Sequence, residues 1–163
     1  MERKALWAPW RMELLNGEKP TGCVFCELPK AGCDRKNLIV HRGERCFVVL
    51  NKYPYNNGHL MVVPSRHLPD LSALTPEESQ EIFALMQKSV DVLKRAYGPE
   101  GYNLGMNLGA AAGAGVRDHV HMHIVPRWNG DTNFMPVLAE VKSMPQHLDA
   151  SYTQLSALFG GSR

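Results

Sequence analysis

The chain has 163 residues, which suits one domain with its own hydrophobic core, and its hydrophobic fraction of 44% and charged fraction of 21% are ordinary for a globular protein. Its net charge of +2 and scattered basic residues argue against a nucleic-acid-binding surface and leave a free nucleotide as the more natural anionic partner. No apolar run reaches the roughly 18 residues of a membrane span and no secretory signal is evident, so we expect a cytoplasmic protein with no membrane partner.

The first part of the chain is predicted to be an N-terminal arm (1–20) that precedes a single domain (21–163). Trp7, Trp10 and Met12 stand among charged residues in this arm. Disordered segments rarely contain two tryptophans. We therefore expect the arm to pack on the domain or on a partner subunit.

Two of the four cysteines, Cys23 and Cys26, form a CxxC pair at the start of the domain. In a reducing compartment this spacing indicates metal binding or redox chemistry more than a structural disulfide. Cys33 and Cys46 are interpreted as unmetallated, and Cys46 is placed inside a strand.

The next segment is predicted to be β-rich. Residues 37–51 are typical of a hairpin with its turn near Gly43 and Glu44, because two β-branched runs flank these residues. The Pro, Asn and Gly of residues 53–58 indicate a tight connection. Residues 59–65 then supply a further strand.

The strongest predicted helix covers 75–98. Thr75 is expected to cap it, with Pro76 at its first position and Glu78 completing a capping box. Gly98 ends it. An apolar stripe at helical spacing is predicted from Ile82, Met86, Val90 (or Ser89), Leu93 and Tyr97.

The last third of the chain is predicted to contain two strands and a helix. The strands cover 102–109 and 119–127, with the small-residue loop 110–118 between them. The helix covers 148–160 and turns Tyr152, Leu155 and Phe159 inward. Strands dominate the middle of the chain and few crossover helices separate them, which favours an antiparallel α+β fold over a parallel doubly wound sheet.

Three histidines at alternate positions, His119, His121 and His123, are expected to share one face of a strand. Polar groups are costly to bury unless they are hydrogen-bonded, so three together argue against simple packing. Two functional interpretations remain open from the residues alone. All three could bind a catalytic zinc ion, or one neutral imidazole could attack phosphorus while the others support it.

Two separated motifs resemble those of the histidine triad (HIT) family. "HVHMHIVPR" is similar to the triad itself, and "LNKYPYNNGHLMVVPSRHLPDL" is similar to the upstream signature. The segments "LWAPWR" and "RWNGDTNFMPV" resemble a bacterial branch near diadenosine polyphosphate hydrolases and phosphorylases. The resemblance implies a HIT-like fold with a five-stranded antiparallel sheet, one long helix and a C-terminal helix. It also implies a homodimer or a higher homo-oligomer.

The resemblance implies an enzyme that cleaves a nucleotide at its α-phosphate through a nucleotidyl-histidine intermediate. His121 would be the nucleophile, His123 would contact the phosphate, and His59 would support the cluster. The expected substrate is a diadenosine polyphosphate or another AMP ester, and hydrolysis is the expected reaction. The alternatives are a diadenosine tetraphosphate phosphorylase, a nucleoside phosphoramidate hydrolase and a nucleotide-binding module without catalysis.

The same resemblance implies a set of substrate-binding residues. Asn51 matches a position that holds the ribose, and Asn107 lies near the position of a phosphate-contacting amide. Many members carry a hydroxyl residue before the triad, whereas this chain has "GAGVRDH", so the backbone N–H groups of Gly115 and Val116 are expected to bind the phosphate instead. Three aromatic residues either wall an adenine pocket or serve packing alone: Phe25, Tyr53 and Tyr55.

A structural zinc site is predicted in addition. Because the chain lacks a second CxxC pair, histidines must complete the site begun by Cys23 and Cys26. The resemblance suggests His67 and His119. Four protein ligands would close the site, so zinc would hold the strand that carries His121 and would take no part in the reaction. The alternative is that the cysteines are free or pack in the core.

Overall fold

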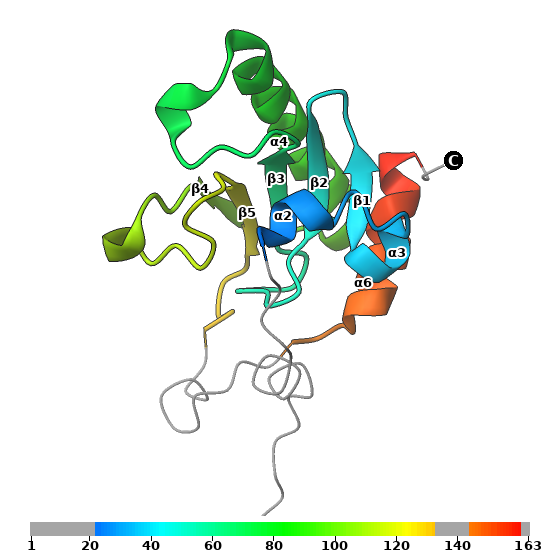
Figure 1. Cartoon of the computed structure of the whole chain (residues 1–163). Coiled ribbons are helices and arrows are strands. Elements are labelled where there is room, and N and C mark those ends of the chain that lie inside the picture. The colour runs from blue at the N-terminus through cyan, green and yellow to red at the C-terminus, as the bar shows by residue number, and fades with distance from the viewer. Residues whose placement is uncertain (1–21, 133–143, 161–163) are drawn as a thin grey trace, which may run out of the picture.

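A five-stranded antiparallel sheet lies at the centre of the computed structural model, which describes residues 22–132 and 144–160 (Figure 1). Its spatial order is β1-β2-β3-β5-β4. The strands are β1 (Ile39–Arg42), β2 (Cys46–Leu50), β3 (Leu60–Pro64), β4 (Gly101–Gly105) and β5 (Met122–Arg127). The antiparallel α+β prediction is confirmed. The predicted arm at 1–20 lies outside the described residues.

Helices cover both faces of this sheet. They are α2 (Val24–Glu27), α3 (Asp34–Asn37), α4 (Pro76–Tyr97) and α6 (Leu148–Phe159), with 3₁₀ turns at Leu71–Ala73 and Ala110–Ala112. Figure 1 shows α4 behind the central strands, α6 beside β1, and the short α2 in front. The long helix and the C-terminal helix are therefore where the fold prediction requires them.

The two sheet faces have separate hydrophobic clusters, because side chains alternate along each strand. The cluster under α4 and α6 takes Val48, Leu60 and Ile124. The cluster under α2 takes Phe47 and Met61. Burying one such side chain contributes about 1.5–3 kcal/mol. Burial on both faces explains why β2 and β3 are continuous apolar runs rather than alternating ones.

Helix α4 begins at the predicted capping box. The Thr75 hydroxyl accepts a hydrogen bond from the Glu78 N–H at 3.2 Å, and the Glu78 carboxylate accepts one from the Thr75 N–H at 2.9 Å. The helix ends at Gly98, whose φ of 54° lies in the left-handed region. Its inward face is wider than the predicted stripe. The buried residues of α4 are Glu78, Ile82, Leu85, Met86, Ser89, Val92 and Leu93.

The strands around the triad are shorter than predicted. β4 ends at Gly105 instead of Gly109, and β5 begins at Met122, so His119 and His121 precede the strand. The cause is a change of partner, since the Val120 N–H donates to the Leu68 carbonyl at 2.7 Å and not to β3. His123 alone of the triad lies in the ladder, opposite Met61 of β3 and Gly105 of β4.

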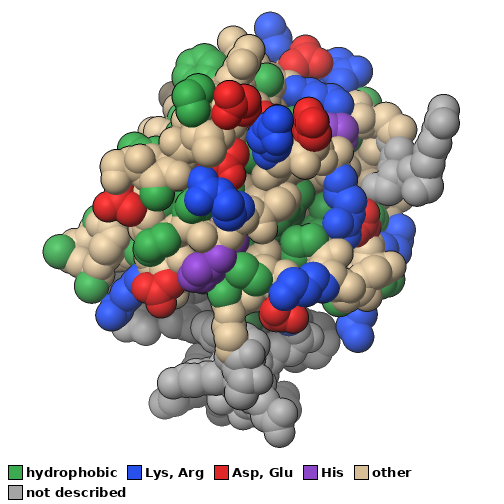
Figure 2. Space-filling model, turned by 45° about the horizontal axis from the view of Figure 1, so that its top comes forward, with side chains coloured by type: hydrophobic (Ala, Val, Ile, Leu, Met, Phe, Trp, Pro, Cys, Tyr) green, Lys and Arg blue, Asp and Glu red, His purple; other side chains and the backbone are tan. Residues whose placement is uncertain are grey.

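The surface and the helices agree with the composition. Figure 2 shows Lys and Arg interspersed with Asp and Glu over the face that it presents, without one large basic patch. Within 22–132 and 144–160, no helix combines the length and the apolar character needed to cross a bilayer.

Candidate active site

Three of the histidines singled out by the sequence meet in one buried cluster. His59, at the loop end before β3, is 0% exposed, and His121 and His123 are 5% and 8% exposed. The ring centroids of His59 and His123 lie 5.0 Å apart, and those of His121 and His123 lie 4.7 Å apart. The cluster occupies the sheet face opposite α4, because His123 pairs with Met61, whose side chain belongs to the cluster under α2.

Hydrogen bonds assign the protons of His59 and His123. Nδ1 of His59 accepts from the Tyr55 N–H at 3.0 Å and lies 3.3 Å from Nδ2 of Asn51, so this nitrogen has the lone pair. The His59 proton is then on Nε2, which donates to Nδ1 of His123 at 2.9 Å. The remaining proton of His123 is on Nε2. These tautomers follow from the network of donors and acceptors.

His121 has the opposite tautomer. Its Nδ1 lies 2.9 Å from the carbonyl oxygen of His119, which can only accept, so Nδ1 has the proton and Nε2 has the lone pair. The ring also packs on Phe25, with centroids 4.9 Å apart. Burial lowers the pKa of His121, although the contact with the His119 carbonyl opposes this shift. A neutral imidazole with an open lone pair is the form that can act as a nucleophile.

His123 has a donor N–H that no other described residue accepts. Burial, followed by the nearby His121, lowers the pKa of His123 to about 4, so the ring is neutral at physiological pH. Its Nε2 is buried without a hydrogen-bond partner among the described residues. A buried N–H without a partner is costly and is matched when an acceptor oxygen arrives. The cluster therefore sets a nucleophilic nitrogen beside a donor.

Sequence reasoning missed the contacts that fix the His59 loop. The Asn56 carbonyl accepts from the His59 N–H at 3.2 Å, while Nδ2 of Asn56 donates to the Pro126 carbonyl at 3.0 Å and to Asp131 at 2.8 Å. Arg127 makes two hydrogen bonds to Asp131, at 2.6 and 2.8 Å, and holds the pKa of that carboxyl well below its usual range. These contacts tie the loop to the end of β5. The Asn-Asn-Gly segment predicted only a turn.

Of the predicted substrate-binding residues, Asn51 contacts the histidine cluster, through Nδ2 at 3.3 Å from Nδ1 of His59. Asn51 accepts from the Tyr53 N–H through Oδ1 at 2.9 Å, so both ends of its amide already contact the His59 loop. Asn107 is half-buried and lies two residues beyond Gly105, the register partner of His123. Gly115 and Val116 lie in the loop just before His119, where Gly115 is exposed and Val116 packs on the cluster under α2. The substrate-binding roles of Asn51, Asn107, Gly115 and Val116 remain predictions.

The predicted metal ligands come together as one group. Cys23, Cys26, His67 and His119 offer ligand atoms that all lie within 4.8 Å of one another. The one-turn helix α2 brings both thiols to one side, since residues three apart in a helix are neighbours. His119 Nδ1 lies 3.2 Å from Cys23 Sγ, and His67 Nδ1 lies 3.4 Å from Cys26 Sγ. This Cys2His2 cluster is compatible with zinc.

His119 joins the metal cluster to the histidine cluster. Its Nε2 donates to the Pro64 carbonyl at 2.9 Å, which leaves the Nδ1 lone pair directed at the thiols. Its own carbonyl accepts the Nδ1 proton of His121. Of the three triad residues, His119 thus faces the cysteines while the other two face each other.

Comparison with known proteins identifies the family. Residues 34–130 match the HIT domain model. The chain belongs to the HIT family. It is 43% identical over 152 residues to the AP-4-A phosphorylase of Mycobacterium tuberculosis, covering 88% of this chain and 77% of that protein. It is 33% identical over 93 residues to the asymmetrical bis(5'-nucleosyl)-tetraphosphatase of Schizosaccharomyces pombe, covering 57% of this chain and 50% of that protein.

A solved structure of a HIT relative has the same fold as this chain and contains zinc. The Zn-bound histidine triad family protein of Mycobacterium smegmatis superposes with a TM-score of 0.68 at 28% identity, covering 85% of this chain and 93% of that one. The HIT fold predicted from the motifs is therefore confirmed. That relative's zinc makes the four-residue cluster of this HIT protein the natural place to test for the metal.

Proposed function

We propose that this HIT enzyme cleaves diadenosine polyphosphates at an α-phosphorus, with Nε2 of His121 as the attacking atom. The observation that carries the proposal is the lone pair on this nitrogen, set by the 2.9 Å contact between Nδ1 and the His119 carbonyl. The related M. tuberculosis and S. pombe enzymes are named for diadenosine or dinucleoside tetraphosphates, which supports the substrate class.

The first step transfers an adenylyl group to the enzyme. With diadenosine tetraphosphate, the His121 lone pair forms an N–P bond while the bond from the α-phosphorus to the bridging oxygen breaks, and ATP leaves. The Nε2–H of His123 donates to an oxygen that gains charge in this step, and a donor of this kind contributes about 3–4 kcal/mol in other enzymes. Asn51 would hold the ribose, and Asn107 with the N–H groups of Gly115 and Val116 would hold the phosphate.

The second step passes the adenylyl group to an acceptor. The N–P bond breaks, the electron pair returns to Nε2 of His121, and the product depends on the acceptor. The name of the M. tuberculosis relative favours inorganic phosphate, which yields ADP. The name of the S. pombe relative favours water, which yields AMP and is the hydrolysis expected from the motifs.

One experiment tests both steps. Diadenosine tetraphosphate is incubated with the enzyme in ¹⁸O-water, with and without phosphate, and the products are identified by mass. Labelled AMP with ATP supports hydrolysis, and ADP with ATP that requires phosphate supports phosphorolysis. His121→Asn should abolish turnover without loss of folding. Turnover of adenosine phosphoramidate alone would contradict the proposed substrate class, and wild-type enzyme without turnover would support a binding module.

Zinc is the proposed structural metal, held by Cys23, Cys26, His67 and His119. The donor set fits because two thiols and two imidazoles match the preference of zinc, and contacts of 3.2 to 3.4 Å approach the roughly 3.5 Å between ligands in a tetrahedral zinc site. When bound, zinc would supply no reaction chemistry, since four protein ligands leave no position for substrate. It would stabilise the His119 backbone that orients His121.

The proposed assembly is a homodimer or higher oligomer that forms along β4. This strand is the sheet edge next to β5, and its Leu104 is 45% exposed. Unpaired edges attract another strand, so pairing of two β4 strands would cover the edge. Light scattering after gel filtration tests this, and Leu104→Asp should lower the measured mass. The proposed compartment is the cytoplasm, which suits the four free cysteines.

A further inference from the structure

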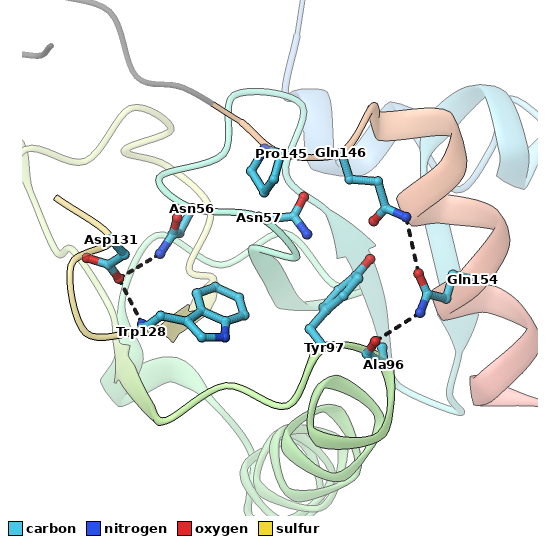
Figure 3. A pocket seen from close by; sticks show the side chains of 9 residues that line it. All are labelled: Asn56, Asn57, Ala96, Tyr97, Trp128, Asp131, Pro145, Gln146 and Gln154. Carbon is cyan, nitrogen blue, oxygen red and sulfur yellow. Dashed lines mark hydrogen bonds between the residues drawn. The ribbon is translucent and has the colours of Figure 1, made fainter. Parts of the chain in front are cut away.

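A cleft of about 500 Å³ lies beside the loop that precedes His59, and no histidine lines it. Its walls come from the ends of α4 and α6, from the loop before His59 and from the turn after β5 (Figure 3). The lining residues are Asn56, Asn57, Ala96, Tyr97, Trp128, Asp131, Pro145, Gln146 and Gln154. This volume is within the range of small-molecule sites, about 300–1,000 Å³.

Two polar side chains at this cleft, Asn57 and Tyr97, have hydrogen-bonding groups that are not paired within the described part of the chain. Asn57 is 6% exposed, and its side-chain amide makes no hydrogen bond to another described residue, although its atoms are not among the fully buried ones. The hydroxyl of Tyr97 is buried and has no well-formed hydrogen bond among the described residues, and its nearest polar neighbour is the Ser151 hydroxyl, which donates to Gln146 at 2.9 Å. Leaving a buried hydroxyl such as that of Tyr97 unmatched costs about 1–3 kcal/mol. Both are satisfied if a ligand brings donors and acceptors to them.

The arrangement of the rings indicates a flat ligand. Figure 3 shows the amide of Asn57 above the space between the indole of Trp128 and the phenol ring of Tyr97. The rim opposite Trp128 is held in place, since Gln146 donates to Gln154 at 3.2 Å and Gln154 donates to the Ala96 carbonyl at 3.0 Å. Aromatic rings offer stacking surfaces to heterocyclic bases, and an Asn amide can donate and accept along one base edge.

The charges around the cleft exclude an anionic group inside it. No Lys, Arg or His is among the described residues that line it. The one charged lining residue, Asp131, already accepts hydrogen bonds from Arg127, Asn56 and the Trp128 N–H. A phosphate would meet no cation here. The part of the ligand that enters the cleft is therefore not anionic.

We propose that this cleft is a second binding site, for an uncharged planar heterocycle with adjacent donor and acceptor groups, as in a purine nucleoside. Asn57 pairs with the edge of the base, the Tyr97 hydroxyl makes one further hydrogen bond, and Trp128 stacks on the ring. The site is distinct from the histidine cluster, because none of His59, His121 and His123 lines it. The proposal is independent of the reaction assigned to that cluster.

Fluorescence gives a local test because the chain has three tryptophans, Trp7, Trp10 and Trp128. In the full-length double variant Trp7→Phe/Trp10→Phe, only Trp128 emits, and adenosine should quench it saturably while ribose at the same concentration should not. The same titration in a background with His121→Ala and His123→Ala should give an unchanged midpoint, which separates this site from the catalytic face.

Variants of the cleft decide the assignment. In the Trp7→Phe/Trp10→Phe protein, Asn57→Leu should raise the dissociation constant for adenosine by about tenfold or more. Tyr97→Phe should raise it by about fivefold, as expected for a lost hydrogen bond in a binding site. Gln87→Leu, on the exposed face of α4, is the matched control and should change nothing. If Asn57→Leu does not fold, Tyr97→Phe provides the test. Absent quenching up to millimolar adenosine, quenching unaltered by both cleft variants, or quenching abolished by the histidine variants would overturn the proposal.

Discussion

His59 Nε2 lies 2.9 Å from His123 Nδ1, and this contact determines which nitrogen of His123 faces the substrate side with a proton. His59 is the donor in this contact because its other ring nitrogen, Nδ1, accepts a hydrogen bond from the Tyr55 N–H. The Tyr55 amide thus sets the tautomer of His59, and His59 in turn sets the tautomer of His123. The N–H that His123 offers to a substrate therefore depends on the loop that contains Tyr55.

Replacing His59 tests this dependence. In His59→Phe the buried volume is filled but the donor to His123 is lost, so both His123 tautomers become populated. We expect kcat for diadenosine tetraphosphate to fall on the order of 10²-fold, as for removal of one oriented donor, with a smaller change in KM. His59→Gln keeps an amide N–H and should recover part of the rate. Equal losses in the two variants, with equal pH profiles, would argue that His59 is only a packing residue.

The buried neutral state of His123 predicts acid sensitivity. Its ordinary pKa of 6.5 falls to about 4 in the folded protein, so the unfolded chain binds a proton first as the pH drops. The stabilisation is complete above pH 6.5 and is lost progressively towards pH 4, at a maximum of about 3 kcal/mol.

Urea unfolding of wild type and His123→Asn at pH 7.5, 6 and 5 measures this contribution. The half-buried His41 and the buried His121 also have pKa values lowered by desolvation, and they act in the same direction in both proteins. The difference between the two proteins should therefore shrink as the pH falls. A constant difference would show that His123 does not titrate in this window.

The cysteines provide a matched pair for the proposed zinc site. Cys26→Ala removes a ligand and should lower zinc affinity by at least about 100-fold and reduce the melting temperature, because metal binding stabilises the fold. Cys33→Ala removes an exposed thiol outside the cluster and should keep the metal. Elemental analysis of the purified proteins gives the stoichiometry. Retention of zinc in Cys26→Ala together with its loss in His121→Asn would reassign the metal to the triad.

Gly58 is predicted to be intolerant of a side chain for two reasons. Its φ of +73° is unfavourable for other residues, and an added Cβ would lie 2.7 Å from Cε2 of Tyr97. Gly130 has a similar φ of +76° but open space around it. We expect Gly130→Ala to cost about 1–2 kcal/mol from the backbone alone, and Gly58→Ala about 2–4 kcal/mol once overpacking is added. Thermal unfolding compares them, and equal losses would rule out the contact with Tyr97.

The sequence predicted the features that depend on short spacing. The capping box at Thr75 and Glu78 and the hairpin around Gly43 need only neighbours a few residues apart, and both are present. The motif resemblance brought Cys26, His67 and His119 together across the chain, because a family pattern encodes tertiary proximity that periodicity does not.

Other features could not be predicted because they depend on contacts between residues that are far apart in the sequence. Asn56 and Asp131 are 75 residues apart, and each alone is typical of a turn. The start of β5 at Met122 is set by the Leu68 carbonyl, which takes the Val120 N–H away from the sheet. Three alternating histidines predicted one continuous strand face, and this long-range contact shortens it.

The two ends of His119 point to different chemistries, since its ring faces thiols while its carbonyl orients the ring two residues later. A substitution of His119 that shifts its backbone would therefore disturb both the cysteine cluster and the orientation of His121. A mutational scan should rank position 119 as nearly as intolerant as position 121, although its imidazole lies among the metal ligands. A mutational scan alone would therefore give both His119 and His121 as candidate nucleophiles, whereas the hydrogen bonds indicate His121.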